Sequence, residues 1–331
     1  MMRLIRVELT RLRWRRAVVA LIGLAIVIPA AIGFSRVWET RPPSAEQQAS
    51  IDARVERDTN RKGIQRQLAD CLADPDGWGV EPGDDQVAAC EEWVLPQPEW
   101  YGPPVLDLAE EHTGGAVVVL TILGMIAILL GTTFAGHDWA SGSMSNQLLF
   151  EPRRHRVWLA KAVAVTATMF LLAAVVATGW WLSMYAVANG RGLAIPDGLV
   201  RDGLEQGLRG AALAAGAALA GYALTMLFRS TVVTLGVLFA VVLAGTTLIG
   251  VLGLDGEGRW LPPNNLVAVV QNGATYYVDT PSECHEGRRP KGVDCSGERH
   301  LSLAQGAGYL GVLTLGIGAA SLGSHRRRDV P

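Results

Sequence analysis

The polar residues that could do chemistry are concentrated in one segment, residues 136–161, between two charge-free apolar blocks. The segment reads GHDWASGSMSNQLLFEPRRHRVWLAK. Met144, Leu148 and Leu149 are four and five residues apart, so they share one face of a helix. Pro152 disfavours continuation of that helix. The pattern predicts a short helix with an apolar face and a basic end, which suits insertion into a groove on a partner protein.

We expect this segment to couple the membrane helices to a partner. A rigid helix here would pass the motion of that partner to the two attached spans. Gly142 and Ser143 loosen the chain before the helix. The alternative is a loop whose basic residues only fix membrane orientation, which leaves the Gly-Ser break and the Leu-Leu-x-x-Pro order unexplained. The candidate coupling residues are Asp138, Trp139, Gly142, Ser143, Met144, Leu148, Leu149, Pro152, Arg153, Arg154, Arg156 and Lys161.

The sequence contains no recognisable motif of an enzyme active site or of a metal site. A Walker A sequence, G-x-x-x-x-G-K-[ST], is absent, so we expect no ATP hydrolysis on this chain. No apolar block carries an ionisable residue near its middle, although ion-coupled carriers use such residues as relays. The six histidines are scattered at block boundaries and in loops. We therefore expect a non-catalytic subunit without metal or cofactor, and without nucleic acid among its partners.

Six apolar blocks predict an all-α integral membrane protein with six transmembrane helices. Half of the residues are hydrophobic and only 18% are charged, against about 25% charged in soluble domains. Each block is long enough to cross a hydrocarbon core of about 30 Å. The first block could instead belong to a signal peptide, but it is longer than the typical apolar core of about 7–15 residues. The expected spans are 17–34, 113–136, 158–187, 210–228, 231–254 and 304–323.

Charge placement orients these spans with both termini in the cytoplasm. The predicted cytoplasmic segments hold 14 of the 29 Lys and Arg residues but only four of the 31 acids, in agreement with the positive-inside rule. The cytoplasmic segments are a basic interfacial leader helix at 1–16, the coupling helix and loop at 137–157, and a basic tail at 324–331; the count of 14 also includes Lys161 at the start of the third span and Arg229 between the fourth and fifth spans. The extracytoplasmic segments are a domain at 35–112 and outer loops at 188–209 and 255–303.

All four cysteines fall in the predicted extracytoplasmic segments, where oxidising conditions favour disulfides. Four cysteines allow three pairings. We expect Cys71–Cys90 and Cys284–Cys295, because the members of each pair share one loop. Four free thiols are the alternative, and the lack of a Cys-x-x-Cys pair disfavours zinc.

Other local patterns predict helices in the outer segments and close packing within the membrane. Ser44 and Gln47 fit a capping box at the start of a helix in the outer domain. In the last outer loop, Leu266–Val270 predicts a short re-entrant or surface helix. The fourth span has small residues spaced by four, which let helix backbones approach closely within one subunit or between two. These small residues are Ala212, Gly216, Ala220, Ala217 and Gly221.

Segment 136–161 resembles the cytoplasmic loop of type 2 ABC transporter permeases. The resemblance is carried by Asp138, Gly142-Ser143, Leu148-Leu149, Pro152, Arg154, Arg156 and Lys161, and by the six-span plan. It implies a half-channel that pairs with a second permease copy, as a homodimer or heterodimer. It also implies two copies of an ABC ATPase subunit, which would bind ATP and Mg²⁺ and dock on the coupling helix. The implied activity is export of a hydrophobic or amphipathic drug, peptide or lipid.

The expected location is a bacterial plasma membrane, among membrane lipids. Only three basic residues are Lys while Arg, Ala, Gly and Val are abundant, a composition typical of a GC-rich bacterial genome. Two other functions fit the sequence. The chain could anchor an extracytoplasmic binding or sensing module, or it could belong to an ABC complex that does mechanical work on the cell envelope.

Overall fold

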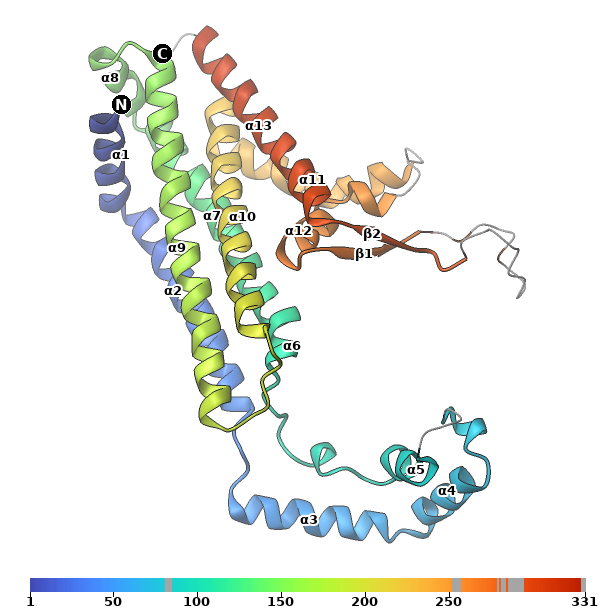
Figure 1. The fold of residues 1–331 in the computed structure, drawn as a ribbon. Coiled ribbons are helices and arrows are strands. Elements are labelled where there is room, and N and C mark those ends of the chain that lie inside the picture. Colours follow the sequence, from blue (N-terminus) through green and yellow to red (C-terminus); the bar gives the residue numbers. More distant parts are fainter. Residues whose placement is uncertain (81–84, 252–256, 279, 281–283, 285–294, 329–331) are drawn as a thin grey trace. The chain divides into compact units, whose positions relative to one another are not determined.

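The computed structural model is mostly helical and describes residues 1–80, 85–251, 257–278, 280, 284 and 295–328 (Figure 1). At 242–243, 245–250 and 257 it describes the backbone alone. The described chain divides into two compact units. One comprises 1–33 and 108–331, and the other comprises 34–107.

Five helices in the described residues are long and apolar enough to cross a membrane, which indicates a membrane protein. They match five of the six predicted spans, and most extend several residues beyond the predicted limits. The five are α2 (Arg16–Glu39), α6 with α7 (Leu108–Thr113 and Gly115–Ala140), α9 (Arg154–Gly190), α10 (Leu199–Phe228) and α13 (Leu303–Arg327).

The remaining predicted span, 231–254, coincides largely with one further helix. This helix, α11, covers Thr231–Val251, and residues 252–254 lie outside the described residues. Its first part, Thr231–Val241, is an apolar helix shorter than a membrane span. A sixth crossing therefore remains a prediction.

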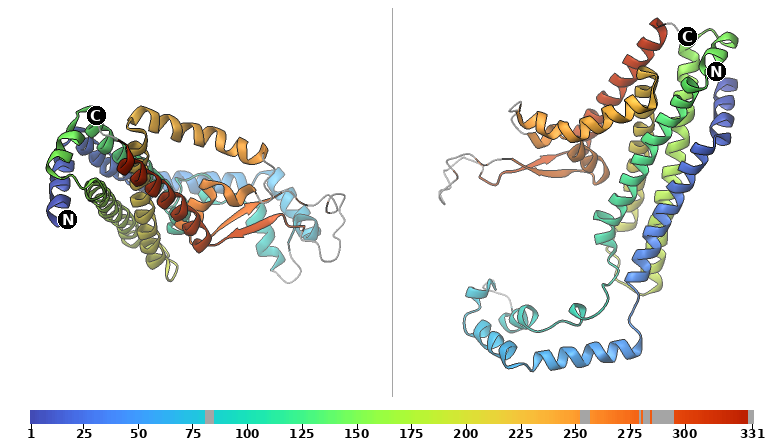
Figure 2. Two further views of the ribbon diagram at one scale, coloured as in Figure 1. Left: turned by 90° about the horizontal axis from the view of Figure 1, so that it is seen from above. Right: turned by 180° about the vertical axis from the view of Figure 1, so that it is seen from behind.

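Helix α10 packs along α7 and α9 at the centre of the larger unit (Figures 1 and 2). Small residues allow the approach to α7. A Cβ atom at Gly131 would lie 2.1 Å from the carbonyl oxygen of Ala218, and one at Gly221 would lie 2.6 Å from that of Ile128. This is the close approach within one subunit that small residues at four-residue spacing permit.

The other small residues of α10 have different surroundings. Ala212 is exposed, and Gly216 would carry a Cβ atom with no neighbour within 4 Å. Ala217 and Ala220 are half-buried. Gly221 therefore serves contact with α7, whereas Ala212 and Gly216 border a groove described below.

The leader forms α1 (Met2–Trp14), which packs against α9. Its turn into α2 occurs at Arg15, whose backbone is extended. In Figure 1 and in the right view of Figure 2, α1, the loop helix α8 (Ser143–Phe150) and the last turn of α13 lie at the same end of the larger unit. The segments that the sequence assigns to the cytoplasm thus meet at one end.

The described part of the segment between α11 and α13 contains a helix and two strands. Helix α12 (Pro262–Val270) includes the predicted Leu266–Val270 helix and packs on α13, where Gly306 lies beside the Asn265 carbonyl. A 3-10 turn, Glu257–Trp260, precedes it. Strands β1 (Ala274–Tyr277) and β2 (Glu298–Leu301) pair antiparallel, with Ala274 opposite Leu301. The all-α expectation therefore holds for the bulk of the chain but omits this pair.

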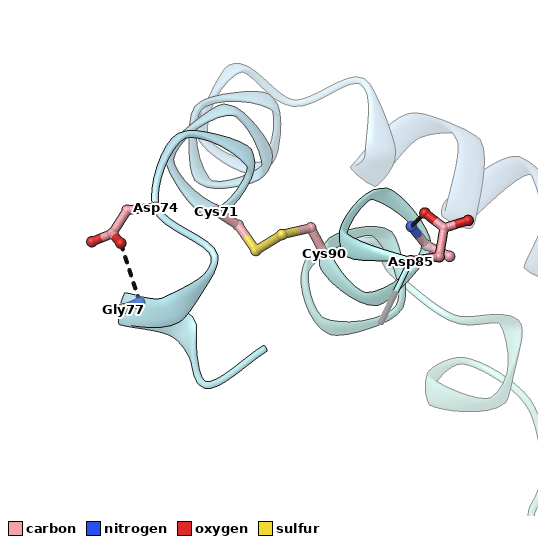
Figure 3. The surroundings of a disulfide bond; sticks show 6 residues. Cys71, Asp74, Gly77, Asp85 and Cys90 are labelled. Atoms are coloured by element: carbon pink, nitrogen blue, oxygen red, sulfur yellow. Dashed lines mark hydrogen bonds between the residues drawn. A yellow bond between two sulfur atoms is a disulfide. The ribbon is translucent and has the colours of Figure 1, made fainter. Parts of the chain in front are cut away.

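Both expected disulfides are present, Cys71–Cys90 and Cys284–Cys295. In the smaller unit, Cys71 lies in the last turn of α4 (Lys62–Ala73) and Cys90 lies in α5 (Gln86–Val94), so the bond joins these two helices (Figure 3). Val80 and Val94 complete its small buried cluster. With so little apolar core, the unit depends on a covalent link.

The remaining elements of the smaller unit are a longer helix and two single turns. Helix α3 (Ala45–Thr59) begins with the predicted capping box of Ser44 and Gln47. The turns cover Asp76–Trp78 and Pro98–Trp100. The Tyr101 hydroxyl donates a 2.6 Å hydrogen bond to the Asp58 carboxylate, and this bond raises the pKa of Tyr101.

Candidate functional site

The candidate site lies around α8, between the end of α7 and the start of α9. Gly142 precedes α8 with a left-handed backbone (φ 66°), a conformation that glycine adopts without the strain a side chain brings. A Cβ atom there would meet no neighbour within 4 Å, so the backbone angle rather than space favours glycine. Pro152 follows α8, and α9 begins at Arg154. The Gly-Ser break and the proline thus delimit α8, as the sequence predicts.

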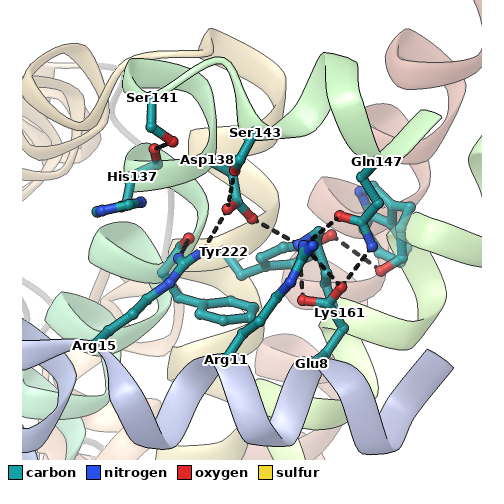
Figure 4. A network of polar contacts seen from close by, with 12 residues as sticks. Glu8, Arg11, Arg15, His137, Asp138, Ser141, Ser143, Gln147, Lys161 and Tyr222 are labelled. Atoms are coloured by element: carbon teal, nitrogen blue, oxygen red, sulfur yellow. Dashed lines mark hydrogen bonds and ion pairs between the residues drawn. The ribbon is translucent and has the colours of Figure 1, made fainter. Parts of the chain in front are cut away.

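Lys161 is the centre of a buried ion network that the structure assembles from three helices (Figure 4). Its Nζ atom lies 2.8 Å from Glu8 Oε2 and 2.6 Å from Asp138 Oδ2. All three side chains are fully buried. Because an isolated buried charge is very unfavourable, each member depends on the others.

Arg15 adds a second positive charge at Asp138. Its guanidinium pairs with the Asp138 carboxylate and also donates a 2.6 Å hydrogen bond to the Phe134 carbonyl. It lies 4.7 Å from the centre of the Phe134 ring, within cation–π range. The acids Glu8 and Asp138 thus face Lys161 and Arg15, and Arg11 lies 3.6 Å from Glu8 at the more exposed edge of the network.

Two polar side chains of α8 bind to this network. The Ser143 hydroxyl donates a 2.7 Å hydrogen bond to Asp138, and the Gln147 amide donates a 2.5 Å hydrogen bond to Glu8. Arg11 in turn donates a 3.1 Å hydrogen bond to the Gln147 carbonyl. Helix α8 is therefore held at both its first turn and its last turn, by contacts with α7 and α1.

The predicted apolar face of α8 is divided between the interior and the surface. Met144 is fully buried, Leu148 is half-buried and Leu149 is 80% exposed. Phe150, which the sequence analysis did not single out, is 91% exposed. Met144 anchors the helix to its own chain, so Leu149 and Phe150 form its exposed apolar tip.

Aromatic contacts connect the same end of the unit to α10 and α13. The Trp158 indole donates a 3.1 Å hydrogen bond to Ser321, and the buried Tyr222 hydroxyl donates a 3.0 Å hydrogen bond to the Trp158 carbonyl. Trp139 packs edge-on against His325, which is 2% exposed. The Arg229 guanidinium lies over the Trp139 ring, 4.8 Å from its centre. These contacts therefore link four candidate spanning helices, α7, α9, α10 and α13, at the end of the unit that carries α8.

The predicted basic residues fall into two groups. Lys161 is buried in the network, whereas Arg153 is exposed and Arg156 is half-buried at the start of α9. Arg154 donates a 2.5 Å hydrogen bond to the carbonyl of Arg328 in the tail. The basic ends of α9 and α13 thus lie side by side.

Glu8 is the main site residue absent from the sequence prediction. It is the one acid in a leader with six arginines, and it lies on the helix face that contains Ile5 and Leu12. An acid at helical spacing between apolar residues was the available signal. Gln147 carried a similar signal, because it lies three residues from Met144 and three from Phe150, both apolar.

The described residues contain no group of three or more His, Cys, Asp or Glu that could hold a metal ion. The candidate site therefore offers ion pairs, hydrogen bonds and an exposed apolar tip. Comparison with protein-family models, curated proteins and solved structures finds no match to this chain.

Proposed function

We propose that this chain is the permease subunit of an ATP-driven ABC exporter, with α8 as the coupling helix that docks on a separate ATPase. One observation carries the proposal: α8 is fixed to a buried ion network at its base and presents Leu149 and Phe150 at its tip. A helix that must transmit force needs such rigid attachment together with an apolar anchor for its partner. The resemblance of segment 136–161 to type 2 ABC permeases supports the same function.

In this mechanism, ATP binding on the partner moves α8, and the ion network passes the displacement on. Asp138 belongs to α7, Lys161 to α9 and Glu8 to α1, so a push on Ser143 or Gln147 acts on all three helices together. Buried ion pairs resist separation because breaking one leaves an unpaired charge in a low-dielectric interior. The helices would then move as a unit and change the path between two permease copies.

The remaining parts of the proposal follow from charge and composition. Six spans with both termini in the cytoplasm would place α8 and the basic tail beside a cytoplasmic ATPase. The partner would supply ATP and Mg²⁺, and this chain would supply no catalytic group. The cargo would be hydrophobic or amphipathic, and the membrane a bacterial plasma membrane.

Co-purification tests the docking surface directly. The chain would be expressed with the ATPase whose reading frame adjoins its own, and the variant Leu149→Asp/Phe150→Asp would be compared with wild type. We expect the amount of ATPase that co-purifies with the variant to be about tenfold lower than with wild type, because the substitutions place negative charges in an apolar contact. Val87→Asp is the matched control, since Val87 is an exposed apolar residue in the smaller unit. Undiminished ATPase recovery with the α8 variant would contradict the proposal.

The compact, disulfide-linked smaller unit favours one second candidate, an extracytoplasmic binding module. Trp93 and Trp100 are more than half exposed there and offer aromatic contacts to a ligand. This candidate predicts that the Leu149→Asp/Phe150→Asp variant functions normally, whereas Trp93→Ala and Trp100→Ala do not. The two functions are thus separated by one set of variants.

A further inference from the structure

An apolar groove of about 800 Å³ lies between α9, α10 and α13, away from the ion network. Its walls include Leu159, Val163 and Phe170 on α9, Gly216 on α10, and Leu315 and Leu322 on α13. Thr166 and Thr314 are its only hydroxyl-bearing lining residues. All three helices are long and apolar enough to span a membrane, so in a bilayer the groove would open toward hydrocarbon.

The length of the groove fits one leaflet of a bilayer. On α9 its lining extends from Trp158 to Phe170. At 1.5 Å per residue this distance is about 18 Å, slightly more than half of a hydrocarbon core of about 30 Å. An extended acyl chain matches this length and the apolar lining, whereas a polar ligand would leave its hydrogen-bonding groups unsatisfied.

One end of the groove is basic. Arg156 lies three residues before Leu159 on α9, and Arg326 lies four residues after Leu322 on α13, so both continue the faces that line the groove. The hydrogen bond from Arg154 to the Arg328 carbonyl holds these two helix ends together. Within the described part of the chain, the side chains of Arg156 and Arg326 form no hydrogen bond or ion pair.

We propose that this groove binds one anionic phospholipid of the surrounding leaflet. An acyl chain occupies the groove, and the phosphate contacts Arg156 and Arg326. Basic pockets between membrane helices recognise anionic headgroups through this combination of charge and apolar length. The site requires neither an ATPase nor a transported cargo, so it stands independently of the proposed permease function.

The test uses the delipidated full-length chain in detergent, with phosphatidylglycerol and phosphatidylcholine of identical acyl chains as probes. Apparent affinity is read from the lipid-dependent rise in melting temperature and from lipid retained in native mass spectrometry. We expect wild type to bind phosphatidylglycerol about tenfold more tightly than phosphatidylcholine. Arg156→Gln/Arg326→Gln should remove most of that preference while leaving phosphatidylcholine binding unchanged.

Matched variants separate the groove from the surrounding surface. Gly216→Leu should fill the groove and weaken both lipids, and it should fold because a Cβ atom there meets nothing within 4 Å. Gly179→Leu on α9 has equally open surroundings outside the groove and should bind as wild type. Arg153→Gln/Arg327→Gln removes the same charge from positions off the groove faces and should keep the preference.

Three results would overturn the proposal. Equal binding of the two lipids by wild type would show that the arginines do not recognise the anionic headgroup. Unchanged lipid binding by Gly216→Leu would show that the acyl chain does not occupy the groove. A shift of the Gly216→Leu variant from dimer to monomer at unchanged lipid binding would show that a second copy of the chain occupies the groove instead.

Discussion

The Glu8–Asp138–Lys161 network and the Cys71–Cys90 bond both join helices, but the two use opposite chemistry. The network is built from side chains that are fully buried at one end of the membrane helices. The disulfide joins α4 and α5 in a small polar unit, where the buried residues described around it are Val80 and Val94, with Ile64, Leu68 and Ala89 partly buried against them. One junction depends on charges that must stay paired, and the other on a covalent bond.

The two kinds of link differ because the two regions differ in how strongly water competes for polar contacts. Among apolar helices, burial alone gives little specificity, since lipid is as apolar as leucine, so paired polar groups define which helices meet. In the smaller unit water competes for every polar contact, and exposed ion pairs contribute little. A disulfide keeps its effect in water, so it suits that unit. Three changes test this division, in order of decreasing expected effect.

Lys161→Met should be the most damaging change. It leaves Glu8 and Asp138 buried together without their shared cation, and breaking a buried pair in this way costs about 3–5 kcal/mol. We expect a large fall in melting temperature and in yield from detergent. Lys62→Met, at an exposed position, is the control.

The double variant Glu8→Gln/Lys161→Met sharpens this test. It removes one acid together with the lysine and leaves Asp138 paired with Arg15, so it should recover much of the stability lost by Lys161→Met. If Lys161→Met melts like wild type, the network does not hold these helices together.

Cys71→Ser/Cys90→Ser should destabilise the smaller unit by about 3 kcal/mol, the effect expected for closing a loop of this size. Limited proteolysis should then cut within residues 34–107 while the membrane helices stay intact. Cys284→Ser/Cys295→Ser is the matched control and should leave cleavage in that range unchanged. Equal protease resistance of wild type and Cys71→Ser/Cys90→Ser would mean that noncovalent packing suffices.

Loss of the Tyr101–Asp58 hydrogen bond should have the smallest effect on stability. This effect depends on pH only in the range where tyrosine ionises. Because the folded pKa of Tyr101 is raised, its contribution to stability is complete below the ordinary tyrosine pKa near 10 and disappears as the pH rises through the folded value. The difference in absorbance at about 295 nm between wild type and Tyr101→Phe reports this ionisation. Asp58→Asn should shift the ionisation of Tyr101 to lower pH. An unchanged titration of Tyr101 in this variant would rule out the contact.

Local patterns in the sequence were sufficient for much of the fold. The apolar blocks locate the spanning helices, Ser44 and Gln47 locate a helix start, and shared loops give both disulfides. Each of these features depends on neighbours along the chain or on a simple length requirement. The strand pair was missed because β1 and β2 are four residues each and are separated by 20 residues.

The candidate site was predictable only in part. The sequence indicates Gly142 and Pro152 as limits of α8 through their backbone preferences. It does not indicate that Lys161 binds Glu8, because these residues are 153 positions apart and only tertiary packing brings them together. For the same reason, the helical spacing of Met144 and Leu149 could not separate the inward residue from the outward one.

The separation between Glu8 and Lys161 has a consequence for synthesis on the ribosome. At about 5–20 residues per second, Glu8 is made roughly 8–30 s before its partner lysine. During that interval its nearest cation is Arg11, one helical turn away in α1 at 3.6 Å. If the leader rests at the lipid headgroups, as its amphipathic pattern predicts, this carboxylate stays hydrated during that delay. Insertion of α9, which carries Lys161, would then complete the junction, so assembly of this end would follow the order of translation.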